Sequence, residues 1–151
     1  MQWVTRSDVR IGRIACTWLI ENVADPGAEI LYVPAADLPA RIEAGAIPFH
    51  VKGVQFDHRD RRTPFEAILE AHGLDADPVL AHMGRVINGA DTDNTLYDQP
   101  EGPGLRALSE GYRALHPGDD AAVLAAMAPV MGALHAYSQS ISTRSSSPTT
   151  M

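Results

Sequence analysis

The stretch "WVTRSDVRIGRIACTWLIENVAD", residues 3–25, decides the fold class of this chain. Its first four residues are short and β-prone, which predicts a strand. From residue 7 onward the apolar residues recur at helical spacing, which predicts an amphipathic helix that Ser7 or Asp8 caps. The apolar residues that carry this pattern are Val9, Ile11, Ile14, Ala15, Trp18, Leu19 and Val23.

The rest of the chain continues this mixture of short strands and helices. "EILYV" at residues 29–33 predicts a second strand, and "VQFDH" at residues 54–58 alternates and predicts a third. Helical patterns cover residues 35–45, 64–74, 77–90, 104–116 and 119–140, and Pro129 predicts a kink or a new start in the last of them. We therefore expect an α+β fold, with a small sheet of about three strands covered by five or six helices.

Length and charge limit the class of protein. With 151 residues, the chain is expected to form a single domain over residues 1–140, followed by a disordered polar tail over residues 141–151. The net charge of −7 opposes binding to the phosphate backbone of nucleic acids. The first residues lack a signal peptide and no apolar run approaches the length of a membrane span, so we expect a cytoplasmic protein without a membrane partner.

The segment "FDHRDRRTPFE" at residues 56–66 holds the first candidate site residues. His58 would lie at the inner end of the predicted third strand, where it is either a metal ligand or a histidine bonded to a backbone carbonyl. Thr63, Pro64 and Glu66 match a capping box at a helix start. Glu66 is therefore either the second half of that box or a ligand.

Acidic and cationic residues elsewhere supply further candidates. Asp91 and Asp93 stand two apart in "GADTD", where they would either bind a cation or form local turns. Arginine side chains suit tetrahedral oxyanions, so Arg6 and Arg13 are candidates for anion binding, although a solvated helix face is the simpler explanation. Cys16 is the only cysteine, so an internal disulfide is excluded, and the simplest expectation is that Cys16 is a small buried apolar residue.

Five blocks of the chain resemble the ChrB-type chromate-resistance domain: "WVTR", "RIACTWLIENVADPGAEILYVP", "GAIPF", "VQFDHRDRRTPFEAIL" and "GADTD". The resemblance runs from about residue 3 to about residue 137. It implies a bacterial stress-response protein that accompanies a chromate efflux transporter. Longer members of the family are regarded as chromate-responsive regulators, with this domain in their C-terminal part. The chain is expected to correspond to that part and to bind no nucleic acid by itself.

The resemblance also implies which polar positions matter, namely Arg6, Arg13, His58, Glu66, Asp91 and Glu101. The chain departs from the family pattern at Thr63, which stands where a cysteine often precedes a "TFE"-like element, here "PFE". This departure speaks against a thiol-based role at that position.

Together these residues predict a site for a metal, an oxyanion or both. His58, Glu66 and Asp91 offer one nitrogen and two carboxylates, a set that suits Mn, Fe or Zn, while Arg6 and Arg13 would hold an anion such as chromate. Glu101, Asp93 and Cys16 remain additional candidates. The first hypothesis is a chromate-resistance accessory or sensor domain, and the alternative is a metal-dependent enzyme, redox-active or not, that uses the same site. A plain interaction module and a homo-oligomer also stay open.

Overall fold

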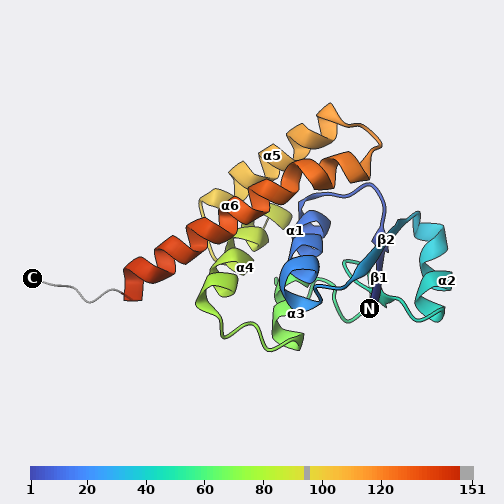
Figure 1. Ribbon diagram of the computed structural model, residues 1–151, viewed down its shortest axis with the longest axis horizontal. Coiled ribbons are helices and arrows are strands. Elements are labelled where there is room, and N and C mark those ends of the chain that lie inside the picture. Colours follow the sequence, from blue (N-terminus) through green and yellow to red (C-terminus); the bar gives the residue numbers. More distant parts are fainter. Residues whose placement is uncertain (94–95, 147–151) are drawn as a thin grey trace, which may run out of the picture.

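A three-stranded parallel sheet lies at the N-terminal side of the fold (Figure 1). The computed structural model describes residues 1–93 and 96–146. The strands are β1 (Gln2–Arg6), β2 (Glu29–Val33) and β3 (Ile47–Pro48), in the order β2-β1-β3. Val4 at the centre of β1 is level with Leu31 on one side and Pro48 on the other.

Helices connect the parallel strands across both faces of the sheet. α1 (Ile11–Leu19) continues as a π-helical turn (Ile20–Ala24) and leads from β1 to β2, while a 3-10 turn (Ala35–Asp37) and α2 (Leu38–Glu43) lead from β2 to β3. Trp3 belongs to the main core with α1, and Val4 packs with Leu38 of α2 in a second, smaller cluster. Adjacent strand residues point to opposite faces, so α1 and α2 cover different faces of the sheet (Figure 1).

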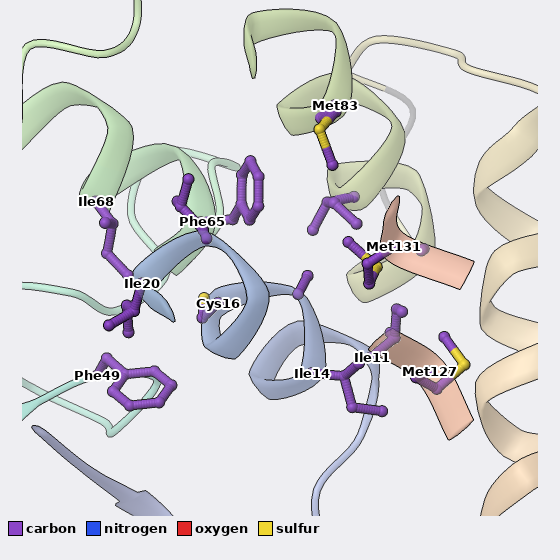
Figure 2. Packing of buried hydrophobic residues seen from close by; sticks show 14 of the residues in the cluster. Ile11, Ile14, Cys16, Ile20, Phe49, Phe65, Ile68, Met83, Met127 and Met131 are labelled. Carbon is purple, nitrogen blue, oxygen red and sulfur yellow. The ribbon is translucent and has the colours of Figure 1, made fainter. Parts of the chain in front are cut away.

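Four further helices pack around α1 and complete the main core. They are α3 (Pro64–Ala71), α4 (Pro78–Asp91), α5 (Glu101–Leu115) and α6 (Asp120–Ser146). Figure 2 shows the apolar side chains of α1 meeting those of α3, α4 and α6. The labelled contributors are Ile11, Ile14, Cys16, Ile20, Phe49, Phe65, Ile68, Met83, Met127 and Met131.

The α+β class and the number of elements are confirmed, but the position of the third strand was wrong. The strand is Ile47–Pro48 rather than residues 54–58, where Phe56 makes only an isolated bridge to Phe49. Proline lacks an N–H donor, so Pro48 weakened the strand signal in the sequence. It is tolerated here because β3 is an edge strand that pairs on one side only.

The expected start of the first helix was also wrong. α1 begins at Ile11, and its N-cap residue Arg10 makes no side-chain capping bond. Asp8 adopts a left-handed backbone conformation with φ of 64°. The amides of Asp8 and Val9 donate to the carboxylate of Asp120 at 2.9 and 3.0 Å, so a residue at the start of α6 fixes this loop.

α6 is one helix that contains Pro129, with no new start there. The predicted boundary at residue 140 falls within this helix, which continues to Ser146, and residues 147–151 lie outside the described residues. An 18-residue window within its stretch Asp120–Thr143 has a mean hydropathy of 1.4, so this helix is long and apolar enough to cross a membrane by length and composition, contrary to the expectation from the sequence. Core helices of soluble proteins share this property, and α6 buries Val123, Met127 and Met131 in the main core.

A buried polar contact joins α4 to α6. The Nδ1 atom of His82 lies 2.7 Å from the hydroxyl of Ser138, and both residues are buried. Replacing Ser138 with alanine leaves the ring nitrogen without its partner, so we expect Ser138→Ala to lower the free energy of unfolding by about 1–2 kcal/mol. Urea denaturation measures the change.

Ser140→Ala is the matched control for this prediction. The Ser140 hydroxyl bonds to a carbonyl of its own helix, that of Tyr137, in an exposed position. Its removal is expected to change the free energy of unfolding by less than about 0.5 kcal/mol. Equal losses in the two variants would show that the His82–Ser138 contact contributes nothing specific.

Candidate functional site

The carboxyl ends of β1 and β3 form one edge of the sheet. β1 ends at Arg6, and the chain then enters α1, which leads to β2 on one side of β1, whereas β3 lies on the other side. The connection from β1 leads to one side of the sheet and the connection that ends at β3 leads to the other side, so the direction of the connections reverses between β1 and β3. In open parallel sheets, ligands bind in the crevice that forms at such a point. His50 follows β3 by two residues and lies at this edge.

Two histidines and one aspartate converge there. The carboxylate of Asp91, the last residue of α4, lies 3.1 Å from Nε2 of His50 and 2.9 Å from Nε2 of His58. One ligand atom from each of the three residues lies within 4.8 Å of the others. We call His50, His58 and Asp91 the triad.

The triad is enclosed on most sides. The side chains of Asp91 and His50 are 10% and 14% exposed, while that of His58 is 39% exposed and provides the open side. The two imidazole rings meet edge to face, with centroids 4.8 Å apart. Gly12 of α1 packs so closely that a Cβ atom there would lie 2.6 Å from Oδ1 of Asp91 and would overlap His50. The backbone of α1 thus forms the floor of the site.

The charges of the triad stabilise one another. Burial raises the pKa of Asp91, but its hydrogen bonds with His50 and His58 outweigh burial and hold the pKa well below its usual range. The same bond to Asp91 raises the pKa of His58, with burial opposing the shift. The site therefore contains an ionised carboxylate held between two rings.

The backbone at His50 is strained. Its φ of 54° lies in the left-handed region, which costs a non-glycine residue about 1–3 kcal/mol. Two backbone bonds impose this conformation, from Phe49 N–H to Val4 C=O and from His50 N–H to Phe56 C=O. Strain of this kind persists only where the surrounding structure imposes it, and it is common at functional sites.

The structure brings together two of the three residues that the sequence suggested as metal ligands. His58 and Asp91 meet, and the third member is His50 in place of Glu66. His50 was missed because the third strand was expected at residues 54–58, which left "GAIPFH" without a role. A histidine at the carboxyl end of a strand is the signal that could have identified it.

Glu66 takes part in a separate hydrogen-bond network. The predicted capping box is confirmed, because Thr63 N–H donates to the Glu66 carboxylate at 3.1 Å and Glu66 N–H donates to Thr63 Oγ1 at 3.4 Å. The same carboxylate accepts from Asn88 Nδ2 at 2.8 Å and from the Tyr97 hydroxyl at 2.5 Å. Both of its oxygens are therefore engaged by protein donors.

The two candidate arginines lie close to the triad but in different surroundings. Arg6 is exposed and lines a cavity of about 340 Å³ together with His50. Arg13 is 4% exposed and donates through Nη2 to the carbonyl of Asp8, while its buried Nε has no hydrogen-bond partner among the described residues. Burial and Arg6 lower the pKa of Arg13, and Asp8 and Asp91 act against this.

The three additional candidates lie outside the triad. Asp93 is exposed and pairs with Arg106 at 2.9 Å. Glu101 begins α5, and one of its carboxylate oxygens accepts from the Tyr137 hydroxyl at 3.4 Å. Cys16 is fully buried, and burial raises the pKa of its thiol well above the usual value, which disfavours a thiolate ligand.

Comparison with known proteins identifies the family that the chain matches. The family described as ChrB, C-terminal domain, matches residues 3–138. Protein ChrB of Cupriavidus metallidurans strain CH34 is 35% identical over 120 residues, which amount to 80% of this chain and 36% of that protein. The chain thus spans about a third of the length of this curated relative. No solved structure matches the chain.

The close contact at Gly12 leads to a prediction. Alanine favours helices over glycine by about 1 kcal/mol, so a substitution in open space should stabilise the protein. In α1, however, the added methyl group of Gly12→Ala must displace His50 and Asp91. We expect Gly12→Ala to lower the free energy of unfolding by about 1–3 kcal/mol, as measured by urea denaturation.

Gly111→Ala in α5 is the matched control, because a Cβ atom there meets nothing within 4 Å. We expect it to raise the free energy of unfolding by about 0.5–1 kcal/mol. If Gly12→Ala stabilises the protein as much as Gly111→Ala does, then α1 does not press against the triad.

Proposed function

The chain belongs to the ChrB C-terminal domain family and is therefore a chromate-resistance related protein, and we propose that it is a cytoplasmic accessory or sensor domain. In this proposal the triad binds a divalent transition metal, and a small oxyanion such as chromate binds beside it. The observation that carries the proposal is the convergence of His50, His58 and Asp91 at the carboxyl edge of the sheet.

The donor set and its spacing support a metal ion. Histidine nitrogen and carboxylate oxygen bind ions such as Zn²⁺ at about 2.0–2.2 Å, so ligands around one ion lie roughly 3–3.5 Å apart. The separations of 3.1 and 2.9 Å between the imidazole nitrogens and the Asp91 carboxylate are close to this spacing, and all three ligand atoms lie within 4.8 Å of one another. Two imidazoles and one carboxylate suit Mn, Fe or Zn. When bound, such an ion supplies positive charge and open coordination positions.

The neighbouring arginines support an oxyanion. Chromate is a dianion with four acceptor oxygens, and the guanidinium group offers several donors in a fixed plane. Arg6 lies in the cavity that His50 also lines, whereas Arg13 is buried outside the cavity lining, and its Nε atom has no hydrogen-bond partner among the described residues. The anion, rather than nucleic acid, is the partner that we propose for this chain, because a net charge of −7 opposes a phosphate backbone.

A metal-dependent enzyme is the second candidate, and the open side of the triad favours it. Structural metal sites are usually closed by four protein ligands, whereas catalytic sites keep a position free. The triad supplies three ligands, with His58 partly exposed. The two functions separate in one assay, in which metal-loaded protein is mixed with excess chromate and a thiol reductant. Turnover beyond one equivalent indicates an enzyme, and stoichiometric binding without turnover indicates a sensor or carrier.

The proposal predicts which residues hold the metal. Protein purified without chelator should contain close to one equivalent of a first-row transition metal by elemental analysis, and His50→Ala and His58→Ala should each lose it. Metal bound to the folded state also raises the melting temperature by mass action. The difference in melting temperature with and without chelator should therefore disappear in both variants.

Glu66→Gln and His116→Ala are the controls. Glutamine can still accept from Thr63 and Asn88, so Glu66→Gln should keep its metal and most of its stability. His116 lies outside the triad, so its removal should change neither readout. If Glu66→Gln loses the metal while His50→Ala keeps it, the set His58, Glu66 and Asp91 is correct instead. Full metal content in both histidine variants would disprove the site.

A further inference from the structure

The cavity beside the triad is lined by two cationic side chains that come from separate segments of the chain. It measures about 340 Å³, and its lining includes Arg6 at the end of β1, His50 of the triad, and Lys52. This volume exceeds that of a tetrahedral oxyanion several times over. Because His50 belongs both to the cavity and to the triad, an ion bound at the triad would border the space in which an anion would lie.

Lys52 is the only lysine among 151 residues. It lies in a tight turn in which Val54 N–H donates to the carbonyl of Val51 and Gly53 adopts a φ of 87°, a conformation that favours glycine. The carboxylate of Asp57 accepts from Gly53 N–H at 2.9 Å and from His58 N–H at 2.8 Å. Asp57 therefore ties the turn that carries Lys52 to the segment that carries His58.

The balance of charge in this region decides when an anion can bind. Arg6, Lys52 and Asp57 are the charged residues that line the cavity, and Asp91 adds a second carboxylate from the triad. Arg13 lies outside the cavity lining, and the two cations and two carboxylates that border the cavity cancel, so the cavity attracts a dianion only weakly by itself. A divalent metal at the triad would add two positive charges, which match the charge of a tetrahedral dianion.

We propose that the oxyanion binds as a direct ligand of the metal ion in this cavity, between Arg6 and Lys52, and that it binds there only when the metal is present. This inference rests on the proposed metal site and deepens it. The class of ligand is a small tetrahedral dianion with oxygen acceptors. A metal held by the triad would leave a coordination position for one oxygen of the anion, and the two side chains would donate charge-assisted hydrogen bonds to the remaining oxygens.

The single lysine allows a direct test on the unmodified chain. An amine-acetylating reagent has two targets in the 151-residue chain, Lys52 and the α-amino group of Met1, which pairs with Asp25 at 3.1 Å and lies outside the cavity lining. The rate of acetylation at each amine is measured by mass spectrometry, with and without molybdate, a tetrahedral dianion that does not oxidise the protein. Metal-loaded and metal-free protein are compared, and chloride keeps the ionic strength constant.

In metal-loaded protein, molybdate at ten times its dissociation constant should slow acetylation of Lys52 roughly tenfold. The rate at Met1 should stay unchanged, and metal-free protein should show no protection at either amine at the same molybdate concentration. Chromate should protect in the same way, since it shares the charge and shape of molybdate.

Two substitutions of Lys52 distinguish the loss of its positive charge from a structural effect on molybdate binding. In equilibrium dialysis of metal-loaded protein, Lys52→Gln should weaken molybdate binding roughly tenfold, whereas Lys52→Arg should keep most of the affinity. Arg41→Gln removes one positive charge from the exposed face of α2, outside the cavity lining, and should leave the affinity unchanged. Metal content is measured in every variant, so a loss of anion binding is not confused with a loss of metal.

The outcomes distinguish this inference from the function on which it rests. If wild-type protein takes up no metal, the proposed function fails before any labelling is done, and this inference fails with it. If metal binds but molybdate leaves Lys52 unprotected, the metal site stands and the anion cavity is wrong. Equal protection with and without metal would overturn the dependence of the anion on the metal.

Discussion

The buried carboxylate of Asp91 is the constraint on which the rest of the site depends. Asp91 ends α4, where the helix dipole disfavours a negative charge, and its side chain is largely withdrawn from water. Removing one charge from water costs several kcal/mol, and His50 and His58 offset this cost by hydrogen bonding. The first turn of α1, which lacks a side-chain cap and touches Asp91 through Gly12, adds a favourable dipole. Three separate segments must therefore meet at one carboxylate.

The topology of the sheet explains how residues far apart in sequence reach this carboxylate. Parallel strands present all their carboxyl ends at one edge, so Arg6 at the end of β1 and His50 after β3 become neighbours without any local signal in the sequence. The order β2-β1-β3 then opens a crevice beside the central strand, and α1 closes one side of it. Fold and site are thus linked through the same connections, since the crossover that makes the strands parallel also brings Gly12 against the triad.

The sequence predicted the features that depend on residues close together in the chain and missed those that depend on contacts between distant residues. The helices, β1 and β2 follow from periodicity, and the capping box of Thr63 and Glu66 follows from residues three apart. β3 was missed because it contains Pro48, which a strand tolerates only at the edge of a sheet, and the order of the strands is not visible in the sequence. The start of α1 depends on Asp120, more than a hundred residues away. His58 and Asp91 were predicted because they stand in distinctive polar segments, whereas His50 became a candidate only with β3 in its observed position.

Backbone strain and its supports give Glu66 a role that requires no metal. Positive φ angles at non-glycine residues occur at His50 of the triad and, just after His58 in sequence, at Asp60 and Arg61. The turn after His58 is held by buried Asn88, whose side-chain amide donates both to the carbonyl of Arg61 and to the carboxylate of Glu66. Asn88 lies on α4 three residues before Asp91, so this network fixes the segment of His58 relative to the helix that carries its partner. A carboxylate that orients two members of the triad through shared hydrogen bonds acts as a positioning residue, which accounts for a glutamate at this position without any role as a ligand.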